Sequence, residues 1–378
     1  MEQDMKKILI GYLIDGNSGG IDKYLMNLMQ SVPFEDGNVQ VDFLTNRITE
    51  VLQSAVSRYH SRVYAVETLK HPIQQFKQMV SILRENQYDV AYFNISTALN
   101  CIGAAAAKKC GVKKRIIHSH ASGIDENNRL KREILTFLNN LIAKTYLYRQ
   151  GTDFCACSEL AGMWLFPEKI VKSDRFQVIK NTVDTKAYVY SPAKREAVRK
   201  AFHLEDKFVV GHIGLFGYSK NHAFLLKVFQ QVYAQNPKAV LLLVGDGVLF
   251  DEIVQQTKLL GLQDAVLFLG RRNDVADLLQ AIDVFVLPSN FEGFGIVGIE
   301  AQISGLSCIF SSRVPKEVAF TDHCVFLDID RENSASEWAK QIVNTGCNPE
   351  RQDNHALAEK AGYGLKTQSV SFLLGEEE

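Results

Sequence analysis

The chain has 378 residues, of which 46% are hydrophobic and 22% are charged, and its formal net charge at pH 7 is −1. This length is too great for one ordinary hydrophobic core, so we predict two domains of a soluble globular protein. The near-neutral charge gives no basic field and argues against nucleic acid as a partner. No run reaches the roughly 18 apolar residues that a membrane-spanning helix needs.

The N-terminus and the cysteines both indicate an intracellular setting. The apolar run Ile8–Ile14 is followed by Asp15-Gly-Asn-Ser-Gly-Gly20, which predicts a strand and a loop, because a signal peptide has a longer apolar core and a small-residue cleavage site. The seven cysteines contain the pair Cys155 and Cys157 but no C-x-x-C pattern, so neither a zinc site nor a disulfide framework is indicated. We expect reduced thiols and a cytoplasmic protein.

Short apolar runs alternate with helical patterns along the whole chain. Predicted helices include Asp22–Ser31 and Ile73–Glu85. Strands separated by helices favour parallel sheets built from βαβ units, and two such sets favour two Rossmann-like domains. The predicted strands are Lys7–Leu13, Val39–Thr45, Arg62–Val66, Tyr88–Asn94, Arg115–His118, Asp153–Ser158 and Phe176–Ile179, then Phe208–Ile213, Val240–Val244, Val266–Leu269, Val284–Leu287, Ser307–Phe310 and Val325–Leu327.

The domain boundaries follow from turn residues and from the last helical pattern. Turn-forming residues from Asn181 to Pro192 indicate a linker. We predict an N-terminal domain over residues 1–183, a linker over 184–206, a C-terminal domain over 207–355 and a terminal segment over 356–378. Within that segment, Ala356–Leu374 has a helical pattern, and Glu376–Glu378 is expected to fray.

Two carboxylates in the second half are the most informative residues. Glu292 and Glu300 flank seven residues in the segment Asn290-Phe-Glu-Gly-Phe-Gly-Ile-Val-Gly-Ile-Glu300, which follows a predicted strand. Gly293 and Gly295 allow close approach of a ligand to the backbone, and Ile296–Ile303 is a predicted helix whose first turn offers unpaired N–H groups. Both carboxylates can face one pocket at the carboxyl end of a strand, an arrangement suited to a diphosphate flanked by two hydroxyl-bearing rings.

The segment Gly214-Leu-Phe-Gly-Tyr-Ser-Lys-Asn-His222 also follows a strand and opens a helix. Its glycines would let phosphate approach the backbone, and Lys220 would supply a positive charge. Taken alone, Lys220 also fits a solvated lysine at a helix cap. Turns of similar composition, Gly245-Asp-Gly247 and Gly270-Arg-Arg-Asn-Asp274, end the next two predicted strands.

Three motifs in the rest of the chain have both a functional and an ordinary interpretation. The loop Gly16–Gly20 is either a phosphate-approaching turn or a simple turn, and it lacks the G-x-G-x-x-G pattern of dinucleotide sites. His118 and His120 point the same way on a strand, but no carboxylate or cysteine cluster joins them, and we interpret His118 as a capping or core histidine. Asp328-Ile-Asp330 superficially matches a metal-binding D-x-D and is interpreted as a surface turn.

The Glu292–Glu300 segment resembles the E-x7-E motif of retaining glycosyltransferases of family 4. The resemblance covers nearly the whole chain, is strongest from Val209 to Val318, and is closest to bacterial members that build capsular or exopolysaccharides. It implies an α/β protein of the GT-B fold, with two Rossmann-like domains and a cleft between them. It also implies that the N-terminal domain is on the acceptor side, that the C-terminal domain binds a nucleotide sugar, and that the C-terminal helix crosses back to the N-terminal domain.

The resemblance assigns roles to individual residues. Lys220 and loop amides would hold the diphosphate, Glu300 the ribose, and Glu292 the donor sugar, while His120 would contact that sugar from the N-terminal domain. No metal and no cofactor would be required. Where the family usually has an arginine five residues before the lysine, this chain has Leu215, and Arg271 or Arg272 are candidates to replace the missing charge. The implied donor-binding residues are Gly19, Gly20, Leu215, Lys220, Gly245, Gly247, Arg271, Glu292, Gly293, Phe294, Gly295, Ile296 and Glu300, and the implied catalytic residues are His120, Glu292 and Lys220.

The function that follows is transfer of a sugar, with retention, from a nucleoside diphosphate sugar to a hydroxyl of a glycan or lipid-linked acceptor in surface polysaccharide synthesis. A UDP-sugar is the expected donor. Two alternatives stay open at this point: a sugar-nucleotide epimerase on the same fold, and a non-catalytic subunit that binds a nucleotide sugar, which Leu215 motivates.

A basic amphipathic pattern covers Asn127–Gln150. Apolar residues recur at helical spacing beside Arg129, Lys131 and Arg132. Such a helix either packs on its own core or lies on an anionic membrane, where it would hold the protein at the inner face.

Overall fold

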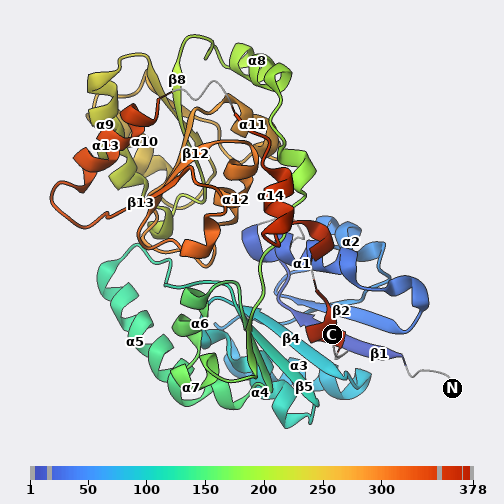
Figure 1. Ribbon diagram of the computed structural model, residues 1–378. Helices are drawn as coiled ribbons and strands as arrows, with labels where there is room; N and C mark the ends of the chain where they lie inside the picture. Colours follow the sequence, from blue (N-terminus) through green and yellow to red (C-terminus); the bar gives the residue numbers. More distant parts are fainter. Residues whose placement is uncertain (1–4, 15–18, 347–350, 368, 375–378) are drawn as a thin grey trace. The chain divides into compact units, whose positions relative to one another are not determined.

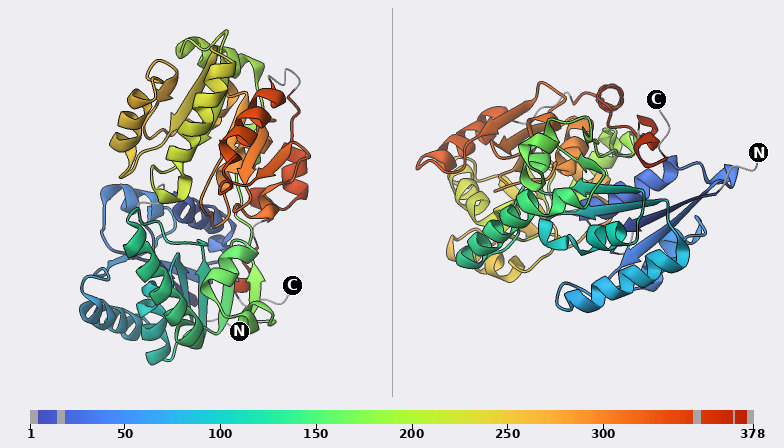
Figure 2. Two further views of the ribbon diagram at one scale, coloured as in Figure 1. Left: turned by 90° about the vertical axis from the view of Figure 1, so that its left-hand side faces the viewer. Right: turned by 90° about the horizontal axis from the view of Figure 1, so that it is seen from below.

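The computed structural model describes residues 5–14, 19–346, 351–367 and 369–374. It divides into two compact units, each built on one parallel sheet with helices on both faces (Figures 1 and 2). The first unit contains Met1–Ile124, Glu133–Thr182 and Leu365–Glu378, and the second contains Asp125–Arg132 and Val183–Gly364. Residues 16–18 of the predicted glycine loop and the tail Glu376–Glu378 lie outside the described residues.

The first unit contains a seven-stranded sheet with the order β3-β2-β1-β4-β5-β6-β7 in the described part of the chain. Strand order reverses between β1 and β4, which pair directly through Ile8–Gly11 and Val90–Phe93. Its strands are β1 (Lys6–Gly11), β2 (Val39–Thr45), β3 (Val63–Ala65), β4 (Val90–Ile95), β5 (Lys114–Ser119), β6 (Asp153–Ala156) and β7 (Phe176–Val178). Its helices are α1 (Gly19–Ser31), α2 (Glu50–Ser57), α3 (Pro72–Asn86), α4 (Ile102–Lys109), α5 (Arg129–Thr145), α6 (Glu159–Leu165), α7 (Glu168–Val171) and α15 (Ser371–Leu374). The first four residues of α5, Arg129–Arg132, are grouped with the second unit.

Both faces of this sheet are buried, because neighbouring residues of a strand point to opposite sides. On β1, Ile8 and Ile10 pack in a cluster with α1, α2 and α15, whereas Leu9 packs in a second cluster with α3, α4 and α6. The C-terminal helix α15 lies beside β1, where the Lys6 ammonium donates to the carbonyl of Leu374 (Figure 1). The continuous apolar character of the strands is thus the signature of a sheet covered on both sides.

The second unit contains a six-stranded sheet with the order β10-β9-β8-β11-β12-β13 among the described residues. Its strands are β8 (Phe208–Ile213), β9 (Ala239–Val244), β10 (Val266–Phe268), β11 (Val284–Leu287), β12 (Ser307–Ser311) and β13 (Cys324–Leu327). Its helices are α8 (Pro192–Ala201), α9 (His222–Gln235), α10 (Phe250–Leu259), α11 (Val275–Ala281), α12 (Ile296–Ile303), α13 (Ser334–Thr345) and α14 (His355–Lys360), with short 3-10 helices η4 (Thr185–Tyr188) and η5 (Tyr218–Lys220).

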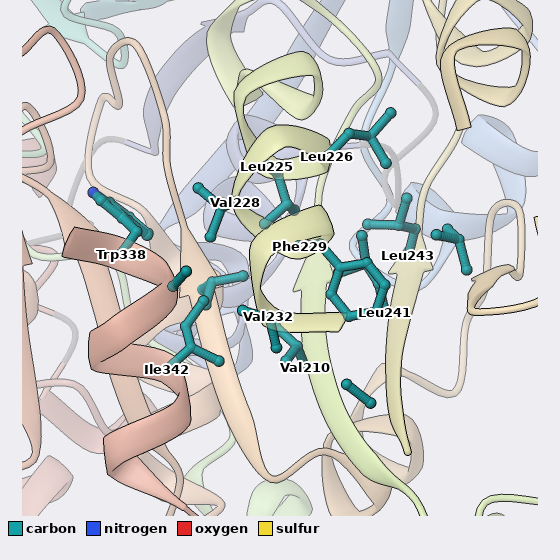
Figure 3. Packing of buried hydrophobic residues seen from close by; sticks show 14 of the residues in the cluster. Val210, Leu225, Leu226, Val228, Phe229, Val232, Leu241, Leu243, Trp338 and Ile342 are labelled. Carbon is teal, nitrogen blue, oxygen red and sulfur yellow. The ribbon is translucent and has the colours of Figure 1, made fainter. Parts of the chain in front are cut away.

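Helix α9 lies at the centre of the main core of the second unit. Figure 3 shows its Phe229 and Val232 directed at strands β8 and β9, while Trp338 of the neighbouring helix α13 lies on its other side. The opposite face of the sheet is covered in part by α12, where Gly298 lets the helix approach Phe310 of β12: a Cβ there would lie 3.0 Å from the ring. Each face of this sheet therefore has its own helical cover.

The predicted α/β class with two Rossmann-like domains is confirmed, since both sheets are parallel and every predicted strand is present within one or two residues of its expected ends. Two predictions about connecting segments are wrong. The predicted linker is ordered structure of the second unit, comprising η4 and α8, and Ser191 caps α8 by accepting from the backbone of Lys194.

The predicted helix over Ala356–Leu374 is also wrong, because it is interrupted after Lys360. Gly362 has φ of 84°, a left-handed conformation that ends α14, and Tyr363 donates from its backbone to Ala358 as in a helix C-terminus. Gly364 then pairs with Val183 in an isolated bridge. The chain consequently enters and leaves the second unit at neighbouring positions.

We predict that Phe229→Ala lowers the free energy of unfolding of the second unit by about 3–5 kcal/mol, because it opens a cavity in a fully buried cluster. The chain has two tryptophans, Trp164 in the first unit and Trp338 in the second. Urea unfolding followed by fluorescence in a Trp164→Phe background therefore reports on the second unit. Leu259→Ala, at a side chain that is 87% exposed, is the control and should change little. An equal effect of both substitutions would contradict the packing described here.

Candidate functional site

The loops after β8 and β11 are brought together by the strand order of the second unit. These two strands are neighbours although two strands separate them in the chain, so their carboxyl ends form the switch point at which open α/β sheets bind ligands. The loops are joined by Asn290, whose backbone donates to Ser219 at 2.7 Å and whose side chain donates to the carbonyl of Tyr218 at 2.7 Å. The structure thus places the two most informative sequence motifs at one edge of one sheet.

Helix α12 begins in the second of these loops and carries one of the two carboxylates. Gly295, at its N-cap, has φ of 90°, a conformation that favours glycine. From Val297 to Ile303 every residue is buried, including Glu300, which is 3% exposed. Glu292, just before the helix, is 8% exposed. Because buried carboxylates are costly unless they are paired, both need polar partners.

Glu292 is partnered by Lys220. The Lys220 ammonium lies 2.5 Å from Oε1 of Glu292, and the hydroxyl of Ser289 donates to the same oxygen at 2.6 Å. The Lys220 side chain is only 16% exposed, so its interpretation as a solvated lysine is wrong. A cation and an anion thus neutralise each other at the switch point, and each has the chemistry to bind part of a charged, hydroxyl-rich ligand.

The glycines at the strand ends allow three loops to lie against one another. Gly214 donates to the carbonyl of Val244, and Gly245 donates to that of Gly270, each at 2.9 Å. A Cβ on Gly245 would lie 2.0 Å from the carbonyl oxygen of Gly214, so no larger residue fits there. Gly247 is likewise pressed against the backbone of Phe216. The predicted residues Gly245, Gly247 and Arg271 therefore belong to loops at the same edge as Lys220.

Glu300 is partnered by a residue that the sequence analysis missed. The hydroxyl of Tyr188, in η4, donates to Oε1 of Glu300 at 2.9 Å. Burial, together with the negative charge of Glu300, raises the pKa of Tyr188 far above its ordinary value, so the hydroxyl stays protonated. Tyr188 lies in the segment predicted as a linker, and no local motif marks it.

Two buried histidines lie behind Lys220, and these too were not predicted. His222 is 2% exposed and stacks on Phe216 with ring centroids 3.9 Å apart, and His212 packs edge-on to it and bonds the carbonyl of Val286 through Nδ1. Burial lowers the pKa of His222 to about 2 and that of His212 to about 4, and the nearby positive charge of Lys220 acts in the same direction. Both rings are therefore neutral at physiological pH.

The predicted histidines of the first unit lie at the end of β5. Their ring centroids are 4.0 Å apart. His118 is fully buried and its Nδ1 lies 2.5 Å from the hydroxyl of Tyr92, which confirms it as a core histidine. His120 is half-buried and its Nε2 lies 2.8 Å from Oδ1 of Asn94, whose amide donates to the carbonyl of Gly11. That amide orientation makes Nε2 of His120 the protonated nitrogen.

The remaining predicted residues lie on the surface or at element ends. Leu215 is 57% exposed, and Arg272 is paired with Asp274 at 2.6 Å, so it is already committed to a surface ion pair. Gly19 and Gly20 open α1, and Phe294 is buried near the ring of Tyr363.

The Asp328–Asp330 segment forms a turn, as predicted, because Oδ1 of Asp328 accepts from the backbone of Asp330 at 2.6 Å. Oδ2 of Asp330 lies 2.5 Å from the guanidinium of Arg313. Within the described part of the chain, no group of three or more His, Cys, Asp or Glu side chains is arranged to hold a metal ion.

The amphipathic pattern over Asn127–Gln150 forms α5 and a short 3-10 helix, Leu147–Arg149. The buried residues of α5 itself are Ala143 and Asn139, whose side chain accepts from the backbone of Ala98. The helix packs on its own core only through part of its apolar surface, at Ile142 and Ala143, whereas five large apolar side chains are 38–68% exposed. We call these residues the α5 stripe; they are Leu130, Ile134, Phe137, Leu138 and Leu141.

No helix in the described ranges is long and apolar enough to cross a membrane.

The chain was compared with known proteins. Residues 193–345 match the family described as glycosyl transferases group 1. A Bacillus subtilis (strain 168) protein that bears the name glycosyltransferase EpsF is 28% identical over 386 residues, covering 99% of this chain and 97% of that protein. The UDP-Gal:alpha-D-GlcNAc-diphosphoundecaprenol alpha-1,3-galactosyltransferase of Escherichia coli is 27% identical over 281 residues, covering 70% of this chain and 68% of that enzyme.

Solved structures agree on the fold. The crystal structure of HepE from Anabaena in complex with UDP and glucose superposes with a TM-score of 0.74 over 98% of this chain and 99% of that one, at 21% sequence identity. The two parallel sheets and these likenesses define a protein of the GT-B fold. The matched residues 193–345 all lie in the second unit.

We predict that the second unit loses stability as the pH falls from 7 to 5. The unfolded chain takes up protons at His212 and His222 near the ordinary histidine pKa of about 6.5, while the folded chain does not, so the unfolded state binds more protons in this range. Each histidine can account for up to about 2 kcal/mol at pH 5. His222→Phe should make the loss smaller, measured by urea unfolding at both pH values with Trp338 fluorescence.

The control is His323→Gln, at an exposed histidine of the same unit, which should leave the pH dependence unchanged. A wild-type stability that does not change between pH 7 and pH 5 would show that these rings take up protons in the folded state.

Proposed function

We propose that this protein is a retaining glycosyltransferase that moves a sugar from a nucleoside diphosphate sugar to a hydroxyl of an acceptor. The observation that carries the proposal is the switch point of the second unit, where the partly buried Lys220 and the buried Glu292 lie on the loops after β8 and β11, and the buried Glu300 lies on the helix α12 that follows. A diphosphate with a sugar on either side has complementary chemistry. The names of relatives support a UDP-sugar donor, because the similar Escherichia coli enzyme uses UDP-Gal and HepE was crystallised with UDP.

Each charged residue has a distinct role in this proposal. Glu300 accepts hydrogen bonds from the ribose hydroxyls, and Glu292 accepts them from the donor sugar. Lys220 binds the diphosphate, together with loop amides and the first-turn amides of α12, which carry partial positive charge. As the glycosidic bond breaks, negative charge develops on the diphosphate, and groups fixed beforehand stabilise it without reorganisation. Retention would follow from same-face attack by the acceptor hydroxyl, assisted by the leaving phosphate.

The ion pair between Lys220 and Glu292 gives this site a resting arrangement. Without donor, the lysine charge is balanced by Glu292 and Ser289 supports the carboxylate. Donor binding would present a diphosphate to Lys220 and sugar hydroxyls to Glu292, so each charge exchanges one partner for another. Each buried charge therefore has an oppositely charged or hydrogen-bonding partner both without donor and with donor bound, which offsets the free-energy cost of its burial.

His120 of the first unit is proposed to contact the donor sugar, an assignment that rests on the family resemblance. Its pKa is lowered to about 3 by burial, so the ring is neutral at physiological pH. With Nε2 bonded to Asn94, a neutral ring has Nδ1 as its acceptor, and this nitrogen would accept from a sugar hydroxyl. His120 would therefore orient the donor and would not serve as a charged acid.

The transfer is proposed to be independent of metal. Lys220 and backbone amides can neutralise part of the diphosphate charge, which is the task a divalent ion performs in other transferases. Leu215 in place of the family's usual arginine removes one positive charge from this region. The compensating role considered for Arg272 is not supported, because its guanidinium is engaged with Asp274.

The acceptor is proposed to be a glycan or a lipid-linked sugar in surface polysaccharide synthesis. The similar Escherichia coli galactosyltransferase acts on a diphosphoundecaprenol-linked sugar. The α5 stripe supports a peripheral contact with the membrane that carries such an acceptor, because contiguous exposed apolar side chains on one helix mark an interaction surface.

The proposed site is tested by titrating UDP into the protein in a buffer that contains EDTA. We expect the wild type to bind, because the groups proposed for the diphosphate are side chains and amides. Glu300→Gln should weaken UDP binding by about 1.5–3 kcal/mol, or roughly 10- to 100-fold, because a charge-assisted hydrogen bond is lost. Glu337→Gln, at an exposed carboxylate on α13, is the matched control and should bind UDP as the wild type does.

Unchanged UDP affinity in Glu300→Gln would remove Glu300 from the ribose site, and binding that requires manganese would overturn metal independence. Incubation with a UDP-sugar alone separates the remaining alternatives. An epimerase converts the donor without an acceptor, whereas a non-catalytic subunit binds nucleotide and turns over no donor with any acceptor.

The membrane contact is tested with the double variant Phe137→Ser, Leu141→Ser. Each fully exposed apolar side chain that inserts into lipid contributes about 1.5–3 kcal/mol, so binding to anionic phospholipid vesicles should fall at least tenfold while UDP affinity is unchanged. Co-sedimentation of the protein with vesicles measures this binding. The control replaces two exposed apolar residues of the second unit, Val248 and Leu259, with serine. If the wild type does not sediment with vesicles at low salt, the α5 stripe serves another partner.

A further inference from the structure

Tyr188 has contacts that connect it to the most buried carboxylate of the site. It is the last residue of η4 and lies five positions after Val183, where the chain enters the second unit. Its hydroxyl donates to Oε1 of Glu300 at 2.9 Å, across 112 residues of sequence. Tyr188 lies outside both of the sequence motifs that form the site, the Gly214–Lys220 loop and the Asn290–Gly295 loop.

The backbone of Tyr188 is held by the same helix that carries Glu300. The hydroxyl of Ser304, at the C-terminal end of α12, donates to the carbonyl of Tyr188 at 2.9 Å and lies 3.1 Å from the carbonyl of Glu300. A second contact fixes η4 from its other end, where the hydroxyl of Thr185 donates to Glu359 of α14 at 3.1 Å. The short helix η4 is therefore held at both of its ends, and this fixes the position of the backbone from which the Tyr188 side chain reaches Glu300.

A carboxylate that binds a pair of adjacent hydroxyls must be both ionised and correctly turned. The side chain of glutamate has three rotatable bonds, and fixing them on ligand binding costs affinity. A donor that already holds one oxygen removes part of this cost. Tyr188 provides such a donor, and because its hydroxyl stays protonated it does so over the whole physiological pH range.

We propose that Tyr188 is a positioning residue of the nucleotide site, whose hydroxyl holds the Glu300 carboxylate in the orientation that accepts the hydroxyls of the donor's ribose. This inference rests on the proposed function, in which Glu300 binds ribose. It assigns to Tyr188 a part of the preference for ribonucleotides over deoxyribonucleotides, since a nucleotide without ribose hydroxyls gains nothing from an oriented carboxylate.

The test compares UDP with 2′,3′-dideoxy-UDP by calorimetric titration. Tyr188→Phe should weaken binding of UDP by about five- to tenfold, while binding of 2′,3′-dideoxy-UDP changes less than twofold. The phenylalanine ring keeps the packing of η4, so a general structural loss is minimised. In steady-state assays the donor KM should rise by a similar factor with kcat nearly unchanged, because the ribose lies away from the bond that breaks.

Tyr363→Phe is the matched control. Its hydroxyl donates to the carbonyl of Glu317 at 2.5 Å in the same unit, so this variant also loses one hydroxyl hydrogen bond of a tyrosine, but not one to Glu300. It should bind both nucleotides as the wild type does. Circular dichroism and urea unfolding of both variants establish that they are folded to the same extent.

Equal weakening of UDP and 2′,3′-dideoxy-UDP by Tyr188→Phe would show that Tyr188 acts through general structure, and unchanged UDP affinity would show that it does not position Glu300. Either result overturns the proposal. Failure of the proposed function itself would look different. A wild type that binds UDP and 2′,3′-dideoxy-UDP equally, or binds neither, has no ribose site at Glu300. If both bind equally, Glu300→Gln would leave the ratio of the two affinities unchanged.

Discussion

The site depends on one constraint, the reversal of strand order between β8 and β11. Because the chain returns to the middle of the sheet for its fourth strand, the loops that leave β8 and β11 meet at their carboxyl ends. Lys220 and Glu292 are 72 residues apart in sequence, and this return brings them into an ion pair. The glycines that end β8 and β9 matter because they let neighbouring loops come close enough to share the same edge.

Buried charge determines much of what surrounds this edge. A cation and two carboxylates are kept there, and each has a defined partner in Lys220, Glu292, Ser289 or Tyr188. The histidines behind Lys220 stay neutral, so they add no further positive charge to the site. Holding these charges in a partly buried site lowers the stability of the fold. Stabilisation of a leaving diphosphate, however, requires charged groups that are held in fixed positions.

The two units use the same architecture for different purposes. In the first unit the end of β5 carries His120, and its hydrogen bond with Asn94 fixes which nitrogen accepts, while α5 places a row of apolar side chains in solvent. In the second unit the corresponding edge carries the charges. In the proposed function these two surfaces would serve a dissolved donor and an acceptor held at a lipid surface.

The sequence by itself determined the strands, the fold class and the spacing of Glu292 and Glu300, because these depend on local hydrophobic patterns and on residues within one or two turns of each other. It could not find Tyr188 or the buried His212 and His222, because their contacts join residues that only the folded sheet brings together. The sequence also could not show whether the α5 stripe is buried or exposed, since an apolar helical face has the same periodicity whether it packs on a core or faces solvent. The tertiary structure decided these points because burial and hydrogen bonding are properties of neighbours in space.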